Sequence, residues 1–298
     1  MTAECRAFVE AEKLADRNVV KACGLLQVSR SAFYTWQSHV PCARALSDAE
    51  LTERIVAAHA QSRGTYGAPR VRDELADQGV HVGRKRVARL MVAAGLAGRC
   101  RRRARRTTYA DPEAKALNLL ARAFGPQNLT IDTVWAGDIT YVRTWEGWAY
   151  LLATVIDLAS RKLVGWAMAD HMESTLVCAA MRMALVEPPG PRAHVPFRPR
   201  QYTSVDFRTL PEEHHITQSL SRRGQCWDNA VSESWFGTYK LELVEGHSWP
   251  TIAKLRSETL LWIESWYNRR RRHSSIGNLS PIDYEDQLTR EHPAAQAA

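Results

Sequence analysis

Three charged side chains, Asp138, Glu233 and Lys240, have the surroundings of groups that could bind a metal ion and a phosphate. Asp138 lies in an apolar stretch with the pattern of a β-strand, where a lone carboxylate is costly to bury unless it is paired or binds a metal. Glu233 and Lys240 are spaced so that a helix would carry them on one face, about 10 Å apart. The alternatives are a structural acid at a strand edge and a solvated helix face.

A helix and several strands must position these groups. The Glu233 helix can be capped by Asp228 or Asn229, because a short polar side chain satisfies the free N–H groups of the first turn. The residues of this helix expected to pack inward are Ala230, Val231, Ser234, Tyr239 and Leu241. Three upstream runs predict an antiparallel meander over residues 133–142, 148–158 and 161–169.

The order of these elements favours one fold class. An acid on the first strand of a meander and a second acid on a late helix are the arrangement of a ribonuclease-H-like nuclease. We therefore predict an α/β fold with a ribonuclease-H-like mixed sheet, preceded by an all-α helix-turn-helix region. The other expected elements are helices at 174–186 and 201–210, a strand at 216–219, and a last helix at 251–267 that leads into a tail.

Positive charge is concentrated in one segment of the chain. Residues 63–106 hold thirteen Lys or Arg and three acids, a net charge of +10, whereas the whole chain carries +8. Charge of one sign gathered in one segment points to a polyanion. No broad apolar face accompanies this charge and no apolar run reaches the ~18 residues of a membrane span, so nucleic acid is favoured over a membrane.

The basic segment has the pattern of a DNA-reading helix pair. A helix is expected to begin at Asp48, a second to run from Arg70 to Gln78 before Gly79, and a third to run from Arg84 to Ala94 before Gly95. The third helix carries the candidate DNA-binding residues Arg84, Lys85, Arg86 and Arg89. A helical hairpin with a solvated basic face is the alternative.

A run of arginines follows these helices. The candidates for phosphate contacts there are Arg101, Arg102, Arg103, Arg105 and Arg106, in what we interpret as a flexible basic linker. The expected organisation is a helical segment at 1–46, a helix-turn-helix domain at 47–98, the linker at 99–130, and a catalytic core with a C-terminal helix and tail at 131–290. The six cysteines include no Cys-x-x-Cys pair, which argues against a zinc site and suits a reducing cytoplasm.

Short motifs spread over nearly the whole chain carry a family resemblance. They are Thr65-Tyr66-Gly67, Arg89-Leu90-Met91, Trp135-x-x-Asp138-Ile139-Thr140-Tyr141, Val155-Ile156-Asp157-Leu158-x-x-Arg161, Gln201-Tyr202-Thr203-Ser204, Ser219-x-Ser221-Arg222-x-Gly224, Asp228-Asn229-Ala230, Glu233-Ser234, Lys240-x-Glu242, Tyr267-Asn268 and His273. With these motifs the chain resembles the DDE transposases of the "insertion sequence three" family, the second-reading-frame products related to retroviral integrases.

The resemblance implies a mechanism and partners. Three carboxylates would hold two Mg²⁺ ions, one activating water or a DNA 3′-hydroxyl and the other stabilising the leaving oxygen. Asp138 and Glu233 match the first and third carboxylates, Lys240 would contact the backbone of the transposon end, and Asp157 would have a structural turn role. The implied partners are DNA at the element ends and target, further copies of the chain, and the first-reading-frame protein, in the nucleoid of a bacterial cytoplasm.

The second carboxylate of the pattern is missing. The family reads His-Ser-Asp-Arg-Gly-x before Gln-Tyr-Thr-Ser, which puts the aspartate at position 197, where this chain has Phe197. Phenylalanine has no oxygen and cannot bind Mg²⁺. Codons for Val195 to Arg200, read one base later, permit Phe-His-Ser-Asp-Arg-Gly. We therefore hypothesise that residues 187–200 are translated out of frame; the alternative is a diverged loop.

Two functions follow from this pattern. The first is a transposase that cuts and joins the ends of its element, with strand transfer lost or severely weakened in this copy. The second is a catalytically inactive DNA-binding remnant or regulator of transposition. The basic segment suits both functions, so only the triad separates them.

Overall fold

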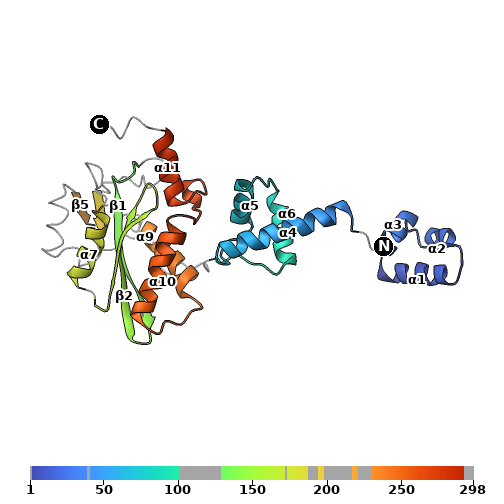
Figure 1. Cartoon of the computed structure of the whole chain (residues 1–298), viewed down its shortest axis with the longest axis horizontal. Helices are drawn as coiled ribbons and strands as arrows, with labels where there is room; N and C mark the ends of the chain where they lie inside the picture. Colours follow the sequence, from blue (N-terminus) through green and yellow to red (C-terminus); the bar gives the residue numbers. More distant parts are fainter. Residues whose placement is uncertain are drawn as a thin grey trace, which may run out of the picture.

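The computed structural model describes residues 2–38, 41–100, 129–171, 173–186, 194–197, 217–220 and 230–291. The predicted short helix at 201–210, the helix caps at Asp228 and Asn229, and the arginines from Arg101 to Arg106 lie outside these ranges. Two groups of helices precede a sheet that is flanked by further helices (Figure 1). In the part of the chain described, no helix is long and apolar enough to cross a membrane.

The first group contains α1 (Ala3–Leu14), α2 (Val19–Leu25) and α3 (Arg30–Gln37). The Asn18 side chain accepts hydrogen bonds from the backbone N–H groups of Val20 and Lys21, which satisfies the first turn of α2. Val9, Ala22, Cys23 and Phe33 form a small core of their own.

The second group contains α4 (Ala43–Gln61), α5 (Ala68–Asp77) and α6 (Arg84–Ala93). Gly79 and Gly95 adopt positive φ angles of 79° and 68° just beyond α5 and α6, as the sequence predicted. The prediction that a helix begins at Asp48 was wrong. Good helix formers precede Asp48, so α4 starts earlier, and the Asp48 carboxylate pairs with another helix.

The sheet has five strands in the order β3-β2-β1-β4-β5. They are β1 (Trp135–Thr144), β2 (Gly147–Asp157), β3 (Leu163–Ala169), β4 (His194–Phe197) and β5 (Thr217–Leu220). The first three form the predicted antiparallel meander, β4 runs parallel to β1, and β5 runs parallel to β4. This is the ribonuclease-H-like mixed sheet expected from the sequence.

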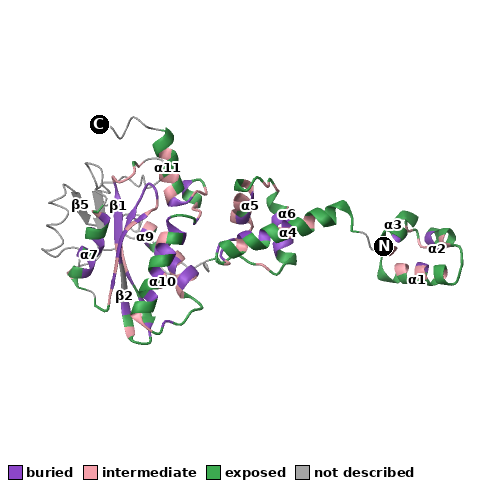
Figure 2. Cartoon of the chain, viewed as in Figure 1, coloured by how far each residue is buried: buried purple, intermediate pink, exposed green. Residues whose placement is uncertain are grey.

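Helices cover this sheet. On α7 (Ser174–Ala184), Leu176, Val177 and Met181 pack with Trp135 and Val155 in one buried cluster. The later helical elements are α9 (Ala230–Tyr239), the π-helical turns η4 (Lys240–Val244) and η5 (Trp262–Tyr267), α10 (Ile252–Leu261), the short 3-10 turn η6 (Ser274–Ile276) and α11 (Pro281–Glu291). The expected tail therefore contains a further helix, α11. Figure 2 shows buried residues along β1 and β2 and on the helix faces turned toward the sheet.

The inward face predicted for α9 needs a correction. The buried residues of this helix are Ser232, Trp235, Phe236 and Tyr239, whereas Ala230 and Ser234 are exposed. Trp235 and Tyr239 stack with ring centroids 5.3 Å apart, and both rings meet Trp262 edge-on. Large aromatic rings therefore set the orientation of α9, because burying them contributes more than burying small residues.

The second helical group shares its core with the sheet domain. Tyr66 packs against Trp266 with ring centroids 5.5 Å apart, and its hydroxyl accepts a 2.7 Å hydrogen bond from the backbone N–H of Arg272. The Arg272 side chain pairs with Glu74 at 3.0 Å and with Asp77. One hydrophobic cluster includes residues of both parts. The helices α4–α6 are therefore docked on the C-terminal segment.

Candidate functional site

Asp138 lies on the central strand β1, beside an irregularity in the sheet. The pairing of β1 with β2 shifts its register between Asp138 and Thr140. Such a bulge re-aims a side chain and is frequent beside functional sites. The half-buried Asp138 carboxylate accepts a 2.9 Å hydrogen bond through Oδ1 from the backbone N–H of Ile139.

Position 197 is the last residue of β4. In the parallel pairing of β4 with β1, the backbone of Phe197 lies opposite that of Gly137, which precedes Asp138. The chain segment in which the sequence pattern lacks its second carboxylate is therefore hydrogen-bonded to the strand that carries the first.

Glu233 is exposed on α9, which packs on the sheet through its other faces. Val231, two residues earlier, contacts the buried cluster formed by Val134, Ala136 and Leu158. This contact holds the helix against β1, the strand of Asp138. The helix therefore carries Glu233 on its solvent side, with its backbone held by buried aromatic rings.

Lys240 begins the π-helical turn that follows α9. It is half-buried, and burial lowers the pKa of its ammonium group. Its Nζ lies 5.5 Å from the centroid of the Tyr141 ring, a cation–π contact that links the turn to β1. Tyr141 is 55% exposed and meets Trp148 edge-on. Aromatic rings interleaved with cations can stack on bases and contact phosphates.

Asp157 is a structural residue, as the sequence indicated. It is fully buried, and its oxygens accept hydrogen bonds from the backbone N–H groups of Asp132 at 2.8 Å, Ala159 at 2.9 Å and Ser160 at 2.7 Å. Burial raises the pKa of Asp157 to about 6, while the hydrogen bonds from Ser160 and Asp132 act in the opposite direction. The carboxylate organises the turn between β2 and β3.

The four candidate DNA-binding residues of the basic helix α6 differ in their surroundings: two of them pair with an acid of α4, and the other two are exposed. Arg86 Nε and Arg89 Nη2 pair with the two oxygens of Asp48 at 2.7 and 2.6 Å, and these hydrogen bonds, that of Arg89 first, lower the pKa of Asp48. Arg84 and Lys85 are exposed, and within the described residues no ion pair is formed by either. The sequence did not indicate that one acid of α4 would hold two of the four candidate DNA contacts.

Two motif residues whose roles the sequence left open, Glu242 and Asn268, form buried polar contacts. Arg271 Nη2 lies 2.8 Å from Glu242 Oε1, with the two side chains 7% and 3% exposed. Trp266 Nε1 donates a further hydrogen bond to Glu242 at 3.2 Å. Asn268 bonds both the N–H and the C=O of Leu163, at 3.0 and 3.1 Å. These contacts tie the C-terminal segment to the turn after α9 and to the edge strand β3.

The fit of these residues to a metal ion is partial. Asp138 and Glu233 supply carboxylate oxygens, the ligands that Mg²⁺ prefers, and Mg²⁺ commonly takes one or two protein carboxylates together with substrate phosphates. Among the residues that the structure describes, no group of three or more His, Cys, Asp or Glu is placed to hold a metal. Of the three carboxylate positions in the sequence pattern, two are acids in this chain, Asp138 and Glu233, and the remaining one is Phe197.

The chain is similar to proteins of known families. Residues 46–104 match the model of an HTH-like domain, and residues 131–226 and 214–281 match two models of an integrase core domain. The transposase InsF for insertion sequence IS3A of Escherichia coli (strain K12) is 37% identical over 287 residues, which are 94% of this chain and 97% of the relative.

A second relative and a solved structure extend the comparison. The 31 kDa protein of insertion element IS600 from Shigella sonnei is 39% identical over 267 residues, 89% of this chain and 97% of its own length. The HTLV-2 integrase catalytic core domain in complex with magnesium aligns with a TM-score of 0.39 at 15% identity, covering 52% of this chain and 97% of that one.

Proposed function

The chain belongs to the family of the IS3-type insertion-sequence transposases, and on this premise we propose that it acts on the ends of an insertion element by Mg²⁺-dependent DNA cleavage and strand transfer. The observation that carries the proposal is the relation of its two acids. Asp138 lies at a bulge of the central strand, and Glu233 is exposed on a helix packed against that strand.

Asp138 and Glu233 would hold Mg²⁺, which supplies Lewis-acid stabilisation of an in-line displacement at phosphorus when bound. Lys240 would hold a backbone phosphate of the element end, with its ammonium group kept beside the Tyr141 ring. Arg84 and Lys85 would contact DNA directly, whereas Arg86 and Arg89 would first exchange their contacts with Asp48. The arginines at 101–103, 105 and 106 would add contacts that are independent of sequence.

We propose that the chemistry of this copy is lost or severely weakened by Phe197. The pairing of its backbone with Gly137 supports this, because it puts an apolar residue type in the segment next to Asp138 where a third oxygen donor would be needed. Resequencing codons 187–200 tests the origin of Phe197. An in-frame aspartate codon at 197 would contradict the proposal that the triad is broken.

A joining assay tests the activity directly. The full chain is compared with a variant carrying Val195→His, Pro196→Ser, Phe197→Asp and Pro199→Gly, using duplexes with the element's terminal sequence and Mg²⁺. We expect joined product only from the repaired chain, and its loss when Glu233→Gln is added. Strong Mg²⁺-dependent joining by the unrepaired chain would overturn the assignment of Phe197, and no joining by either would count against the catalytic role.

The second candidate function is that of an inactive DNA-binding remnant or a regulator of transposition. The exposed cations Arg84 and Lys85 on a well-packed α6 favour it, because DNA binding by these helices does not need the triad. In either function subunits would pair, since two element ends must meet, and the first-reading-frame protein would be a further partner in the bacterial nucleoid. Tight DNA binding without joining by the unrepaired chain would support the remnant.

A further inference from the structure

The hairpin of β1 and β2, drawn in green in Figure 1, carries a pair of aromatic rings on its surface. Tyr141 and Trp148 are 55% and 47% exposed, and their rings meet edge-on with centroids 5.1 Å apart. Val142 and Ala149, the next residue on each strand, are buried in the main hydrophobic core. Because side chains alternate between the two faces of a strand, this ring pair lies on the face turned away from that core.

Each ring of the pair is accompanied by a cation. Arg143 lies opposite Trp148 in the strand pairing, with its guanidinium carbon 5.7 Å from the centroid of the Trp148 ring. Lys240 Nζ lies 5.5 Å from the centroid of the Tyr141 ring. An apolar partner would have to cover both charges together with the rings, which is costly. Nucleic acid suits the surface better, because it offers bases to the rings and phosphates to the cations.

The hairpin is held in place at its turn. The backbone N–H of Trp145 donates a 3.0 Å hydrogen bond to the carbonyl oxygen of Trp249, and that of Ile252 donates a 2.8 Å hydrogen bond to Glu146 Oε2. These bonds fasten the turn to the segment that leads into α10. The strands that carry the two rings are therefore fixed at their open end, away from the centre of the sheet.

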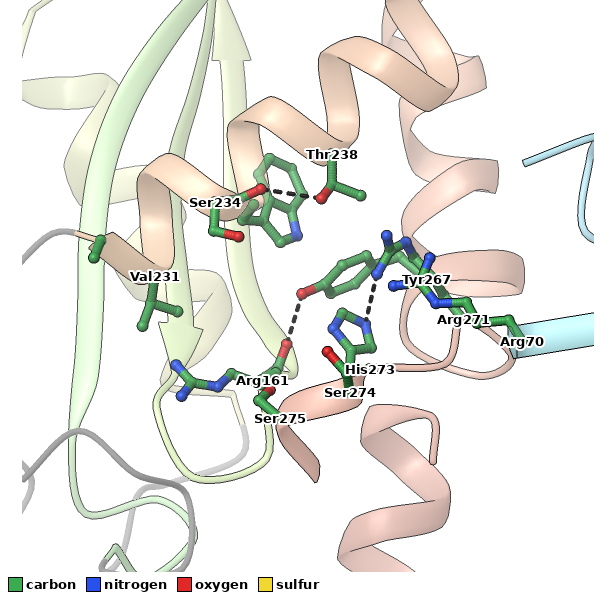
Figure 3. Close-up of a pocket in the computed structure, with 12 residues that line it drawn as sticks. Arg70, Arg161, Val231, Ser234, Thr238, Tyr267, Arg271, His273, Ser274 and Ser275 are labelled. Carbon is green, nitrogen blue, oxygen red and sulfur yellow. Dashed lines mark hydrogen bonds between the residues drawn. The ribbon is translucent and has the colours of Figure 1, made fainter. Parts of the chain in front are cut away.

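The helix that leads to Lys240 is held as well. Tyr267 meets Trp235 of α9 edge-on with centroids 5.7 Å apart, and its hydroxyl donates a 3.0 Å hydrogen bond to the backbone oxygen of Arg161 (Figure 3). The C-terminal segment thus ties α9 to the turn between β2 and β3. Rings and cations that are positioned before binding lose little conformational entropy when a ligand arrives.

The ring pair lies near the proposed metal site along β1. Tyr141 and Arg143 are three and five residues beyond Asp138, which is about 10 and 16 Å at the rise of a strand. In B-DNA these distances correspond to about three to five base pairs. Inside a duplex the base faces are stacked on one another, so a side-chain ring reaches one only when the base is extruded or unpaired. The rings therefore suit an unpaired base close to the reacting bond.

We propose that the ring pair of Tyr141 and Trp148 stacks on an unpaired base of the element end, within about five nucleotides of the cleaved bond, with Arg143 and Lys240 at the flanking phosphates. The inference rests on the proposed function and deepens it, because it adds a base contact to the phosphate and metal contacts. A second copy of the chain is the other occupant that an exposed aromatic surface could have, and the test separates the two.

Binding of the full chain to duplexes with the element's terminal sequence tests the proposal, with one abasic site moved along each strand and without Mg²⁺. We expect one or two positions at which loss of the base weakens binding by the wild-type chain about tenfold, the effect of one lost stacking contact. An abasic site opposite such a position should tighten binding, because the stacked base no longer has to be unpaired. Trp148→Ala should weaken binding to intact DNA and reduce both responses to less than twofold.

The matched control is Trp145→Ala, which removes a ring from the turn of the same hairpin that is 73% exposed. It should leave the response to abasic sites unchanged. Trp148→Phe, which keeps an aromatic ring, should retain the response, whereas Trp148→Leu, which is apolar but not aromatic, should lose it. Thermal melting checks that every variant is folded. Equal responses of wild type and Trp148→Ala at all positions would overturn the proposal, as would loss of the response in Trp145→Ala.

Two further outcomes separate this contact from the proposed function. If the wild-type chain does not bind the element end, both proposals fail; if it binds but is insensitive to abasic sites at every position, the stacking proposal alone fails. Sedimentation velocity of the free proteins addresses the second occupant. A smaller assembly for Trp148→Ala, together with an unchanged response to abasic sites, would identify the ring pair as a subunit interface and overturn the DNA assignment.

Discussion

The backbone of Phe197 pairs with that of Gly137 in the parallel ladder between β4 and β1. Asp138 is the next residue along β1. This pairing locates the departure from the family pattern in the fold. Position 197 is the last residue of β4, and β4 lies next to β1, the strand that carries Asp138. Position 197 therefore lies beside the proposed metal site in the sheet and not in a remote loop.

The carboxylates of Asp138 and Asp157 should behave in opposite ways. Asp157→Asn removes an acceptor from a buried carboxylate that holds three backbone N–H groups, so we expect a loss of about 1–3 kcal/mol in the free energy of unfolding. Asp138→Asn should change stability by less than about 0.5 kcal/mol, and in the repaired chain it should abolish joining. Urea unfolding and the joining assay measure the two effects, and equal destabilisation by both variants would contradict the division of roles.

Removing one charge of the buried ion pair between Glu242 and Arg271 should lower the free energy of unfolding more than removing both charges. Glu242→Gln leaves the Arg271 charge without its partner in a buried site, for which we expect a loss of about 3–5 kcal/mol. Replacing both residues with Gln and Met should cost less than the single change. The control is the surface pair of half-buried Glu258 with exposed Lys254, for which Glu258→Gln should cost about 0–1 kcal/mol. Unfolding curves in urea decide the comparison.

Stability should fall on acidification because of His273. Its folded pKa is well below 6.5, so above pH 6.5 the imidazole is neutral in both states. Below pH 6.5 the unfolded chain takes up a proton that the folded chain does not, and stability is lost at up to about 1.4 kcal/mol per pH unit. His273→Gln should flatten the pH dependence of unfolding between pH 7 and 5. The exposed His81 is the control, and an equal effect of His81→Gln would disprove the assignment.

Close packing of α7 on β3 should make Gly165 intolerant of a side chain. A Cβ added at Gly165 would lie 2.3 Å from the backbone oxygen of Ala180 and 2.9 Å from Cβ of Ala184. We expect Gly165→Ala to cost about 1–3 kcal/mol, because the helix must move away from the sheet. Gly24→Ala is the control, since nothing lies within 4 Å of the added atom and alanine favours the helix by roughly 0.5–1 kcal/mol. Thermal melting of both variants is the measurement.

Local pattern in the sequence was sufficient to predict much of the fold. Three strand-like runs between residues 133 and 169 predicted the meander, and Gly79 and Gly95 marked the ends of α5 and α6. Both were predictable because strand and helix signals depend on residues that are close in the chain. The motifs around Asp138 and Glu233 likewise indicated the family. These motifs are short and local in the sequence, so they can be recognised without knowing how the elements pack.

Only the tertiary structure decided the relations between distant residues. Asp48 pairs with arginines about forty positions away, Tyr66 contacts Arg272, and Arg70, Arg161 and His273 meet in one cavity. The buried face of α9 was also decided there, because Trp235 and Tyr239 pack against rings that arrive from η5. Such contacts depend on how elements dock, and a local pattern does not specify which partner will cover a face or neutralise a charge.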